Sequence, residues 1–219
     1  MSEIKVHGFL YYRVPRGFRN REERKRVHDA VEEVKQFPGV VAVYPYNLVG
    51  LRASAELGFW VATQDIEAYQ RVGSRFLQTN LEFTASLWGF VRPSQYTGQS
   101  GVSVEVPGKR KRFLVVYPFI KTHDWYQLSA DDRRALMKEH ARMGHSFKEI
   151  EQLLVYCTGI ADWEFVVGYE MDDLQHFSEL VMALRSTGGR PYTRRDTPIY
   201  AGRYGALQEV LQDVFGEEA

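Results

Sequence analysis

The residues best suited to chemistry lie in the stretch from Tyr117 to Trp163. Tyr117 ends an apolar run, and Lys121 follows it by four positions. His140 lies on the apolar stripe of a predicted helix. Because a buried imidazole needs a partner, His140 is either a core histidine bonded to a backbone carbonyl or a ligand of a metal or haem. One histidine suffices for haem iron, since the porphyrin supplies the other four nitrogens.

Generic catalytic motifs are missing from the sequence. It has no Gly-rich loop opening a helix after a strand, no Walker loop, no HExxH and no nucleophile elbow, which argues against nucleotide, zinc and serine-hydrolase chemistry. Its 28 basic and 28 acidic residues cancel, so a basic field for nucleic acid is not expected. The basic run 109–112 is interpreted as a solvated loop.

The sequence predicts a cytoplasmic protein that does not enter a membrane. Its single cysteine, Cys157, cannot form an internal disulfide, which fits a reducing compartment. The N-terminus is polar, and no apolar run approaches the roughly 20 residues that span a bilayer.

Two kinds of periodicity define the elements that must position these residues. Eight short runs of β-branched and aromatic residues predict strands at 9–12, 40–44, 59–61, 87–91, 113–117, 153–156, 165–167 and 199–202. Apolar residues at helical spacing predict helices at 20–34, 66–76, 129–147, 174–184 and 207–214. Asn20 and Ser129 are the predicted N-caps of the first and third of these helices.

These elements occur twice in the same order. Residues 59–63 followed by Asp65 match residues 165–169 followed by Asp173, with a two-residue insertion. We therefore predict an α+β fold of two tandem ferredoxin-like halves, whose antiparallel sheets are covered by helices and are packed together or fused into a barrel. The predicted halves are 1–105 and 106–219, joined through the polar segment 94–108.

Several short segments of the second half carry a family resemblance. In order along the chain they are 117–121 (YPFIK), 125–128 (WYQL), Glu139-His140 with Gly144, 156–165 (YCTGIADWEF) and Leu184-Arg185. Together they resemble the haem-binding half of the chlorite dismutase-like family. The resemblance implies that residues 106–219 bind haem with His140 as the proximal iron ligand, and that residues 1–105 bind none.

Within that family the sequence is most similar to the coprohaem decarboxylase branch. This implies that hydrogen peroxide drives the conversion of two propionates of iron coproporphyrin III into vinyl groups, giving haem b. Tyr117 matches the redox-active tyrosine, and Lys121 would place or protonate a reacting propionate. Arg185 would hold a propionate through charge-assisted hydrogen bonds. Trp125 and Trp163 would wall the pocket, although both could be plain core aromatics.

The distal side of the expected haem site separates the branches. Chlorite dismutases have an arginine there, whereas this sequence has Gln152, or Leu153 because the spacing from the proximal histidine is one residue shorter than expected. Neither residue supplies a cation, which argues against chlorite chemistry. The loop with Arg190, Arg194 and Arg195 departs from the family pattern. It could bind further propionates or be a solvated turn.

Alternatives to the decarboxylase remain open at this point. They are a chlorite dismutase or peroxidase-like enzyme, a haem carrier or sensor, and a relative without haem in which His140 is structural. The partners expected from the resemblance are a porphyrin, hydrogen peroxide, further copies of the chain in a homopentamer and, transiently, a ferrochelatase.

Overall fold

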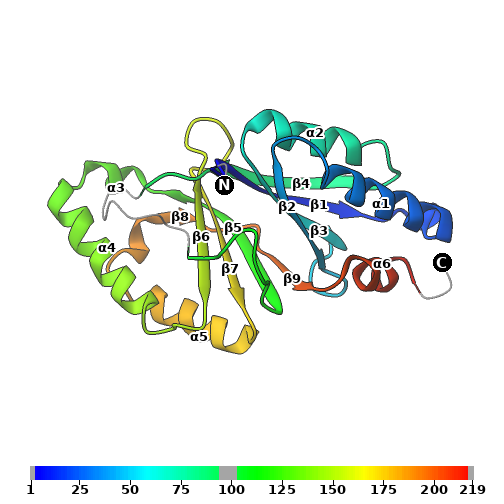
Figure 1. The fold of residues 1–219 in the computed structure, drawn as a ribbon. Helices are drawn as coiled ribbons and strands as arrows, with labels where there is room; N and C mark the ends of the chain where they lie inside the picture. The colour runs from blue at the N-terminus through cyan, green and yellow to red at the C-terminus, as the bar shows by residue number, and fades with distance from the viewer. Residues whose placement is uncertain (1–2, 94–102, 217–219) are drawn as a thin grey trace.

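The computed structural model describes residues 3–93 and 103–216. They form two consecutive units with the same element order, strand–helix–strand–strand–helix–strand (Figure 1). The first unit consists of β1 (Val6–Arg13), α1 (Arg21–Val34), β2 (Val40–Asn47), β3 (Leu57–Thr63), α2 (Ile66–Phe76) and β4 (Glu82–Phe90), with a 3-10 turn at Arg16–Phe18.

The second unit repeats this order and adds short elements to it. It consists of β5 (Phe113–Lys121), α3 (His123–Gln127), α4 (Ala130–Gly144), β6 (Glu151–Tyr156), β7 (Phe165–Met171), α5 (Leu174–Arg185), a 3-10 turn (Arg190–Tyr192), β8 (Thr193–Arg195), β9 (Tyr200–Tyr204) and α6 (Leu207–Phe215). All eight predicted strands and all five predicted helices are present. The sequence did not predict α3, β8 or the 3-10 turns, because they are too short to show a periodicity.

The strands of both units join into one closed, antiparallel barrel. The strand order is β4-β1-β3-β2 in the first unit and β6-β7-β5-β9 in the second, which is the ferredoxin-like order in each. The units are joined by pairing of β2 with β9 and of β4 with β6. The predicted α+β fold of two ferredoxin-like halves is therefore confirmed, and the two sheets are fused into a barrel.

Because side chains alternate across each strand, the barrel has an apolar interior and two apolar outer faces. The interior holds, among others, Phe9, Trp60, Leu114, Leu153 and Val166. One outer face packs against α1, α2 and α6, and the other against α5 with α4 beside it (Figure 1). The last helix of the chain thus covers the first unit, where it contacts α1 and β2.

The internal match found in the sequence ends at equivalent helix caps. Asp65 accepts a hydrogen bond from the backbone N–H of Ala68 at 2.7 Å, and Asp173 accepts one from Gln175 at 2.8 Å. Each carboxylate begins the helix that follows its strand, α2 or α5. The repeat therefore preserves the turn from strand to helix as well as the order of elements.

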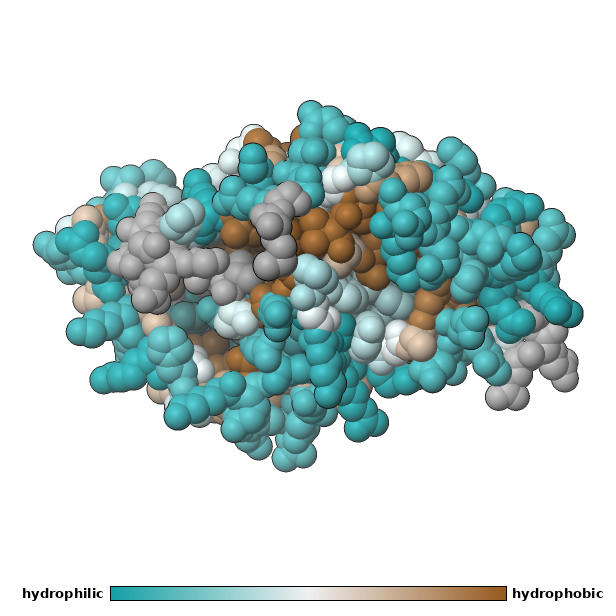
Figure 2. Space-filling view, viewed as in Figure 1, coloured by the Kyte–Doolittle hydropathy of each residue, from teal (hydrophilic) through white to brown (hydrophobic). Residues whose placement is uncertain are grey.

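Polar side chains cover most of the face seen in Figure 2, and an apolar area lies near its centre. Within residues 3–93 and 103–216, none of the helices has the length and apolar character needed to cross a bilayer.

Candidate functional site

The candidate site lies on the second unit, where α4 covers the outer face of the barrel loosely. Ser129 caps α4, its hydroxyl oxygen accepting the N–H of Asp132 at 3.1 Å as the sequence predicted. No residue of α4 is buried. On the sheet, Tyr117 and Leu154 are also only half-buried. A helix that buries none of its residues packs loosely on the sheet and can move aside for a ligand at a small cost in packing.

His140 lies on α4 and is half-buried. Burial lowers the pKa of its imidazole, and the positive charge of Lys121 lowers it further, while Glu139 acts in the opposite direction. The imidazole is therefore neutral at pH 7 and keeps a nitrogen lone pair for a metal. Within the described residues, His, Cys, Asp and Glu form no group of three that could hold a bare metal ion. His140 thus suits a metal that brings its other ligands with it.

Lys121 ends β5 and points its ammonium at an aromatic ring. Its Nζ lies 4.4 Å from the ring centroid of Trp125, a side chain that is 1% exposed. Burial lowers the pKa of Lys121 to about 8, with Glu164 opposing this and Arg190 adding to it. A lysine in this environment holds its proton weakly enough to donate it near neutral pH.

Glu164 fixes the segment that carries Lys121. One carboxylate oxygen accepts the backbone N–H of Lys121 at 2.6 Å, and the other accepts the hydroxyl of Tyr126 at 2.7 Å. The carboxylate thereby ties the end of β5 to α3. Glu164 falls inside a segment that resembles the family, yet nothing in the sequence alone marked it as a partner of Lys121.

Tyr117 lies on the outer face of β5 and stacks on Tyr169 of β7, with ring centroids 6.1 Å apart and an interplanar angle of 28°. Burial raises the pKa of the Tyr117 phenol well above its ordinary value, and Tyr169 and Asp196 raise it further, while Arg190 opposes them. Tyr117 is therefore a protonated phenol at neutral pH. Arg190 itself is paired with Asp196 at 2.6 Å.

Tyr117, Lys121, Trp125 and His140, which the sequence singled out, thus lie in one region. Electrostatic coupling links His140 to Lys121, and it links both Lys121 and Tyr117 to Arg190. For the loop with Arg190 the sequence left two roles open, a propionate contact or a solvated turn. In the structure the charge of Arg190 acts on both the tyrosine and the lysine.

Gln152 and Leu153 project from opposite faces of β6. Leu153 is 1% exposed and packs in the barrel interior. Gln152 pairs with Tyr169 in the sheet register and is exposed, so its side chain lies on the same outer face as Tyr117. Of the two residues considered for the distal position, only Gln152 faces the side of the barrel that α4 covers.

Arg185 and Trp163 are placed differently from the residues around Lys121. Arg185 is exposed at the end of α5. Trp163 packs against the barrel-interior cluster, and the guanidinium of Arg195 lies 4.9 Å from its ring centroid. Arg194 is exposed. The structure therefore gives Trp163 a packing role at the barrel, beside Arg195.

The interpretation of residues 109–112 as a solvated loop is wrong for Arg110. This residue is 6% exposed, and its guanidinium forms an ion pair with the buried carboxylate of Glu170 at 2.9 Å. The sequence could not indicate this, because the partner is 60 positions away and a run of four cations normally faces water.

The fold and this arrangement place the chain among proteins with a duplicated ferredoxin-like barrel. The family model described as chlorite dismutase matches residues 21–205, and the chain belongs to this family. It is 27% identical over 218 residues to a coproheme decarboxylase from Mycolicibacterium smegmatis, covering 96% of this chain and 94% of that protein.

Other comparisons extend the likeness. A crystal structure of a mutant chlorite dismutase from Candidatus Nitrospira defluvii in complex with cyanide superposes with a TM-score of 0.86 at 22% identity, covering 97% of this chain and 95% of that one, which shows the shared fold. The chain is also 28% identical over 110 residues to a Haloarcula marismortui protein provisionally named as heme-binding. That match covers 48% of this chain and 16% of that protein.

Proposed function

We propose that this chain is a coprohaem decarboxylase, which uses hydrogen peroxide to convert two propionates of iron coproporphyrin III into vinyl groups and so forms haem b. The observation that carries the proposal is the grouping of a protonated tyrosine, a low-pKa lysine and a neutral histidine at one loosely covered face. The name of the Mycolicibacterium relative agrees with it. In this proposal residues 106–219 bind the porphyrin and residues 1–105 do not.

The residues present fit an iron porphyrin. His140 offers one neutral nitrogen, which is what an iron already held by four porphyrin nitrogens requires. Arg133 lies on the same face of α4, two turns before His140, and its buried Nε has no hydrogen-bond partner among the described residues. A buried, unpaired guanidinium nitrogen fits a ligand that brings carboxylates. His140 is therefore the proposed iron ligand.

Tyr117 is the proposed catalytic residue. When bound, the iron porphyrin is both substrate and redox centre, and its reaction with peroxide supplies the oxidising equivalents. Tyr117 gives up one electron and its phenolic proton, and the resulting phenoxyl radical takes a hydrogen atom from the propionate β-carbon. The second oxidising equivalent of the same peroxide would take up a further electron, so that the bond to the carboxyl group would break to give carbon dioxide and a vinyl group. Each propionate thus consumes one peroxide and one proton and yields one carbon dioxide and two waters.

Cations around Tyr117 bind and orient the carboxylates. Lys121 holds a reacting propionate as an ammonium and can pass it a proton, because its pKa is lowered to about 8. Arg190, whose charge acts on both Tyr117 and Lys121, is the proposed contact for the same or a neighbouring carboxylate, in exchange for Asp196. Arg185, exposed at the end of α5, is the proposed contact for a further propionate. Trp125 orients Lys121 by a cation–π contact with its ammonium.

Gln152 is the proposed distal residue, and it favours decarboxylation over chlorite chemistry. Its side chain is a neutral amide on the face shared with Tyr117. Turnover of chlorite would gain from a cation that holds an oxyanion near the iron, and an amide supplies none.

The assembly and location proposed here rest on the family resemblance. We propose a cytoplasmic homopentamer that receives its porphyrin from a ferrochelatase by transient contact. Sedimentation equilibrium of the holoprotein tests the pentamer directly.

The reaction itself is tested by adding iron coproporphyrin III to the purified protein, titrating hydrogen peroxide and following the porphyrin by mass spectrometry. Stepwise loss of two carboxyl groups is expected. Binding without a change in mass would show a haem carrier instead. Release of oxygen from chlorite at an enzymatic rate would show a chlorite dismutase.

A further inference from the structure

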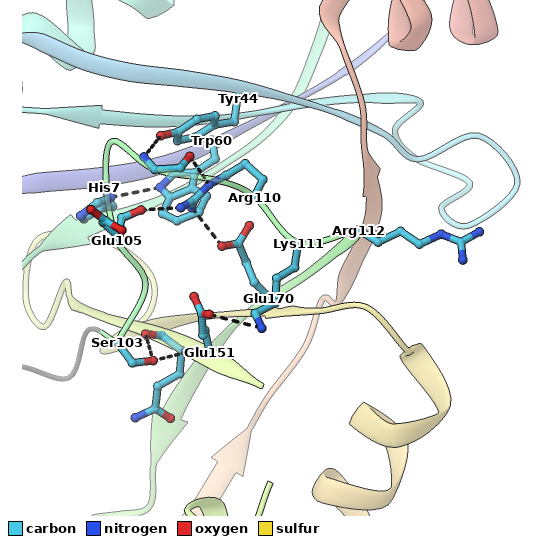
Figure 3. A network of polar contacts seen from close by, with 12 residues as sticks. His7, Tyr44, Trp60, Ser103, Glu105, Arg110, Lys111, Arg112, Glu151 and Glu170 are labelled. Atoms are coloured by element: carbon cyan, nitrogen blue, oxygen red, sulfur yellow. Dashed lines mark hydrogen bonds and ion pairs between the residues drawn. The ribbon is translucent and has the colours of Figure 1, made fainter. Parts of the chain in front are cut away.

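The segment that joins the two halves reaches the candidate distal residue. Residues 103–112, here called the strap, run from β6 into the barrel and on to the start of β5 (Figure 3). At its first residue, the N–H of Ser103 donates to the carbonyl of Gln152 at 2.8 Å. The hydroxyl oxygen of Ser103 accepts the N–H of Gln152 at 2.7 Å. Ser103 therefore binds both the N–H and the carbonyl of Gln152, on the edge of β6 that faces away from β7.

Ser103 fills a gap in the barrel at this point. On one side β6 pairs with β7 along its whole length, with Gln152 opposite Tyr169. On its other side the register with β4 contains the single pair Phe90–Tyr156 within the described residues. Without Ser103, the backbone of Gln152 would have a free edge and freedom to tilt.

The strap is anchored inside the barrel by Arg110. Its guanidinium carbon lies 4.6 Å and 4.8 Å from the ring centroids of Tyr44 and Trp60, and the group pairs with Glu170 and donates to the carbonyl of Glu105 (Figure 3). Its Nε also donates to the carbonyl of Gly108 at 3.3 Å, and a guanidinium with two aromatic rings and three acceptors around it has little freedom to move. Arg110 therefore fixes the position of the strap relative to the barrel interior.

The far end of the strap is attached to the same two strands. Lys111 forms an ion pair with Glu151, the neighbour of Gln152, at 3.3 Å. The N–H of Arg112 donates to the carboxylate of Asp172, just after β7, at 2.9 Å. In contrast, the side-chain amide of Gln152 is exposed and makes no hydrogen bond to another described residue. The strap thus fixes the backbone of Gln152, while no described residue holds its amide in place.

We propose that Ser103 is a positioning residue for Gln152: through the strap it sets the angle at which the Gln152 amide meets a small ligand bound on the distal side of the iron. This inference rests on the proposed haem site. It concerns the affinity of that site for peroxide or an anion, and it does not require that the bound porphyrin lose carboxyl groups.

Amide hydrogen exchange of the protein without porphyrin tests the first part of the proposal. In Ser103→Ala the N–H of Gln152 loses its acceptor, so its exchange is expected to accelerate about fivefold, as for loss of one hydrogen bond. Ser103→Thr keeps the hydroxyl and should restore the slow rate. Ser86→Ala is the matched control, because it removes a hydroxyl 2.9 Å from the Tyr69 hydroxyl in the first unit and should leave Gln152 unchanged.

Cyanide binding to the ferric haem b complex tests the second part. Ser103→Ala is expected to change the cyanide Kd by about fivefold, and Ser103→Thr to restore it. In a Gln152→Ala background, Ser103→Ala should have no further effect, because Ser103 acts only through Gln152.

Two results would overturn the proposal: an unchanged exchange rate of Gln152 in Ser103→Ala, or an equal shift of the cyanide Kd in the presence and absence of the Gln152 side chain. Neither depends on turnover. Failure of the wild-type protein to decarboxylate iron coproporphyrin would refute the proposed function and leave both measurements informative.

Discussion

Arg110 and Glu170 form an ion pair inside the barrel, with Nη1 2.9 Å from Oε2 and both side chains 1% exposed. Arg110 comes from the strap between the two halves, and Glu170 comes from β7 of the second half. The hydroxyl of Tyr46 on β2 of the first half also donates to Glu170, at 3.3 Å. One carboxylate therefore connects the strap, the first half and the second half, and its titration should affect the whole barrel.

Substitution Arg110→Met should destabilise the protein by about 3 kcal/mol at pH 8, because it leaves the Glu170 carboxylate buried without its cation. The loss should be smaller at pH 5, where Glu170 can take up a proton. Urea unfolding at both pH values measures it. Arg112→Met is the matched control, since Arg112 is an exposed member of the same basic run and should cost less than about 1 kcal/mol. Equal losses for the two variants would contradict the structural role assigned to Arg110.

Glu170 should make the protein less stable as the pH rises from about 4.5 to 7. Burial raises the pKa of Glu170 to about 7, against the opposing pull of Arg110, so in this window the native state keeps a proton that the unfolded chain has lost. Stability therefore decreases with pH, by up to about 3 kcal/mol for this group. Glu170→Gln should remove that component of the curve. The same slope in wild type and variant would show that Glu170 does not titrate there.

The fold could be predicted from the sequence because its elements carry regular patterns. Strand β7 begins with an apolar run at 165–167, and α1 has both its cap Asn20 and a stripe of valines. The repeat was visible because both halves keep an aspartate at the same strand-to-helix turn, Asp65 and Asp173. Whether the two sheets stack or fuse depends on pairings such as that of β2 with β9, which are too distant in sequence to leave a local pattern.

The site was predictable only in part, and for a physical reason. Tyr117, Lys121 and His140 lie in ordered segments whose residue types resemble a family, so they could be singled out. Whether Gln152 or Leu153 faces the site depends on which side chains of β6 point outward. The spacing from His140 is one residue shorter than the family pattern, so the sequence alone does not decide between them. The hydroxyl of Ser103 contacts the backbone of Gln152, 49 positions away, so the residue type at position 152 gives no sign of the pairing.

His140→Ala should weaken haem binding by at least about tenfold. Removing a residue that hydrogen-bonds to a metal ligand usually costs about this much, and removing the ligand itself should cost more. A Soret titration of the apoprotein with haem measures the affinity. Free imidazole should partly restore the spectrum by filling the vacated position. His145→Ala is the control, because His145 lies on the same helix end and is exposed. An unchanged Kd in His140→Ala would assign a structural role to this residue.

Tyr117→Phe should abolish decarboxylation and leave the Kd for iron coproporphyrin within about twofold of wild type, since only a hydroxyl is removed from a ring that keeps its stacking on Tyr169. Mass spectrometry after peroxide addition measures turnover. Tyr69→Phe is the matched control, because it removes the hydroxyl of a buried tyrosine in the first half, away from Tyr117, and it should retain turnover. Decarboxylation by Tyr117→Phe at the wild-type rate would refute the redox role of Tyr117.

Lys121 should give the reaction an upper pH limit. Burial lowers the pKa of its ammonium to about 8, so the cation that binds a propionate is present below pH 8 and is lost above it. The KM for iron coproporphyrin should therefore rise about tenfold between pH 7 and 9.5, as expected for loss of one charge-assisted hydrogen bond.

Lys121→Arg stays charged and should move this rise to higher pH. Lys138→Arg, an exposed position on α4, should leave the profile unchanged. If wild type and Lys121→Arg lose affinity at the same pH, another group sets the limit and Lys121 does not hold the substrate.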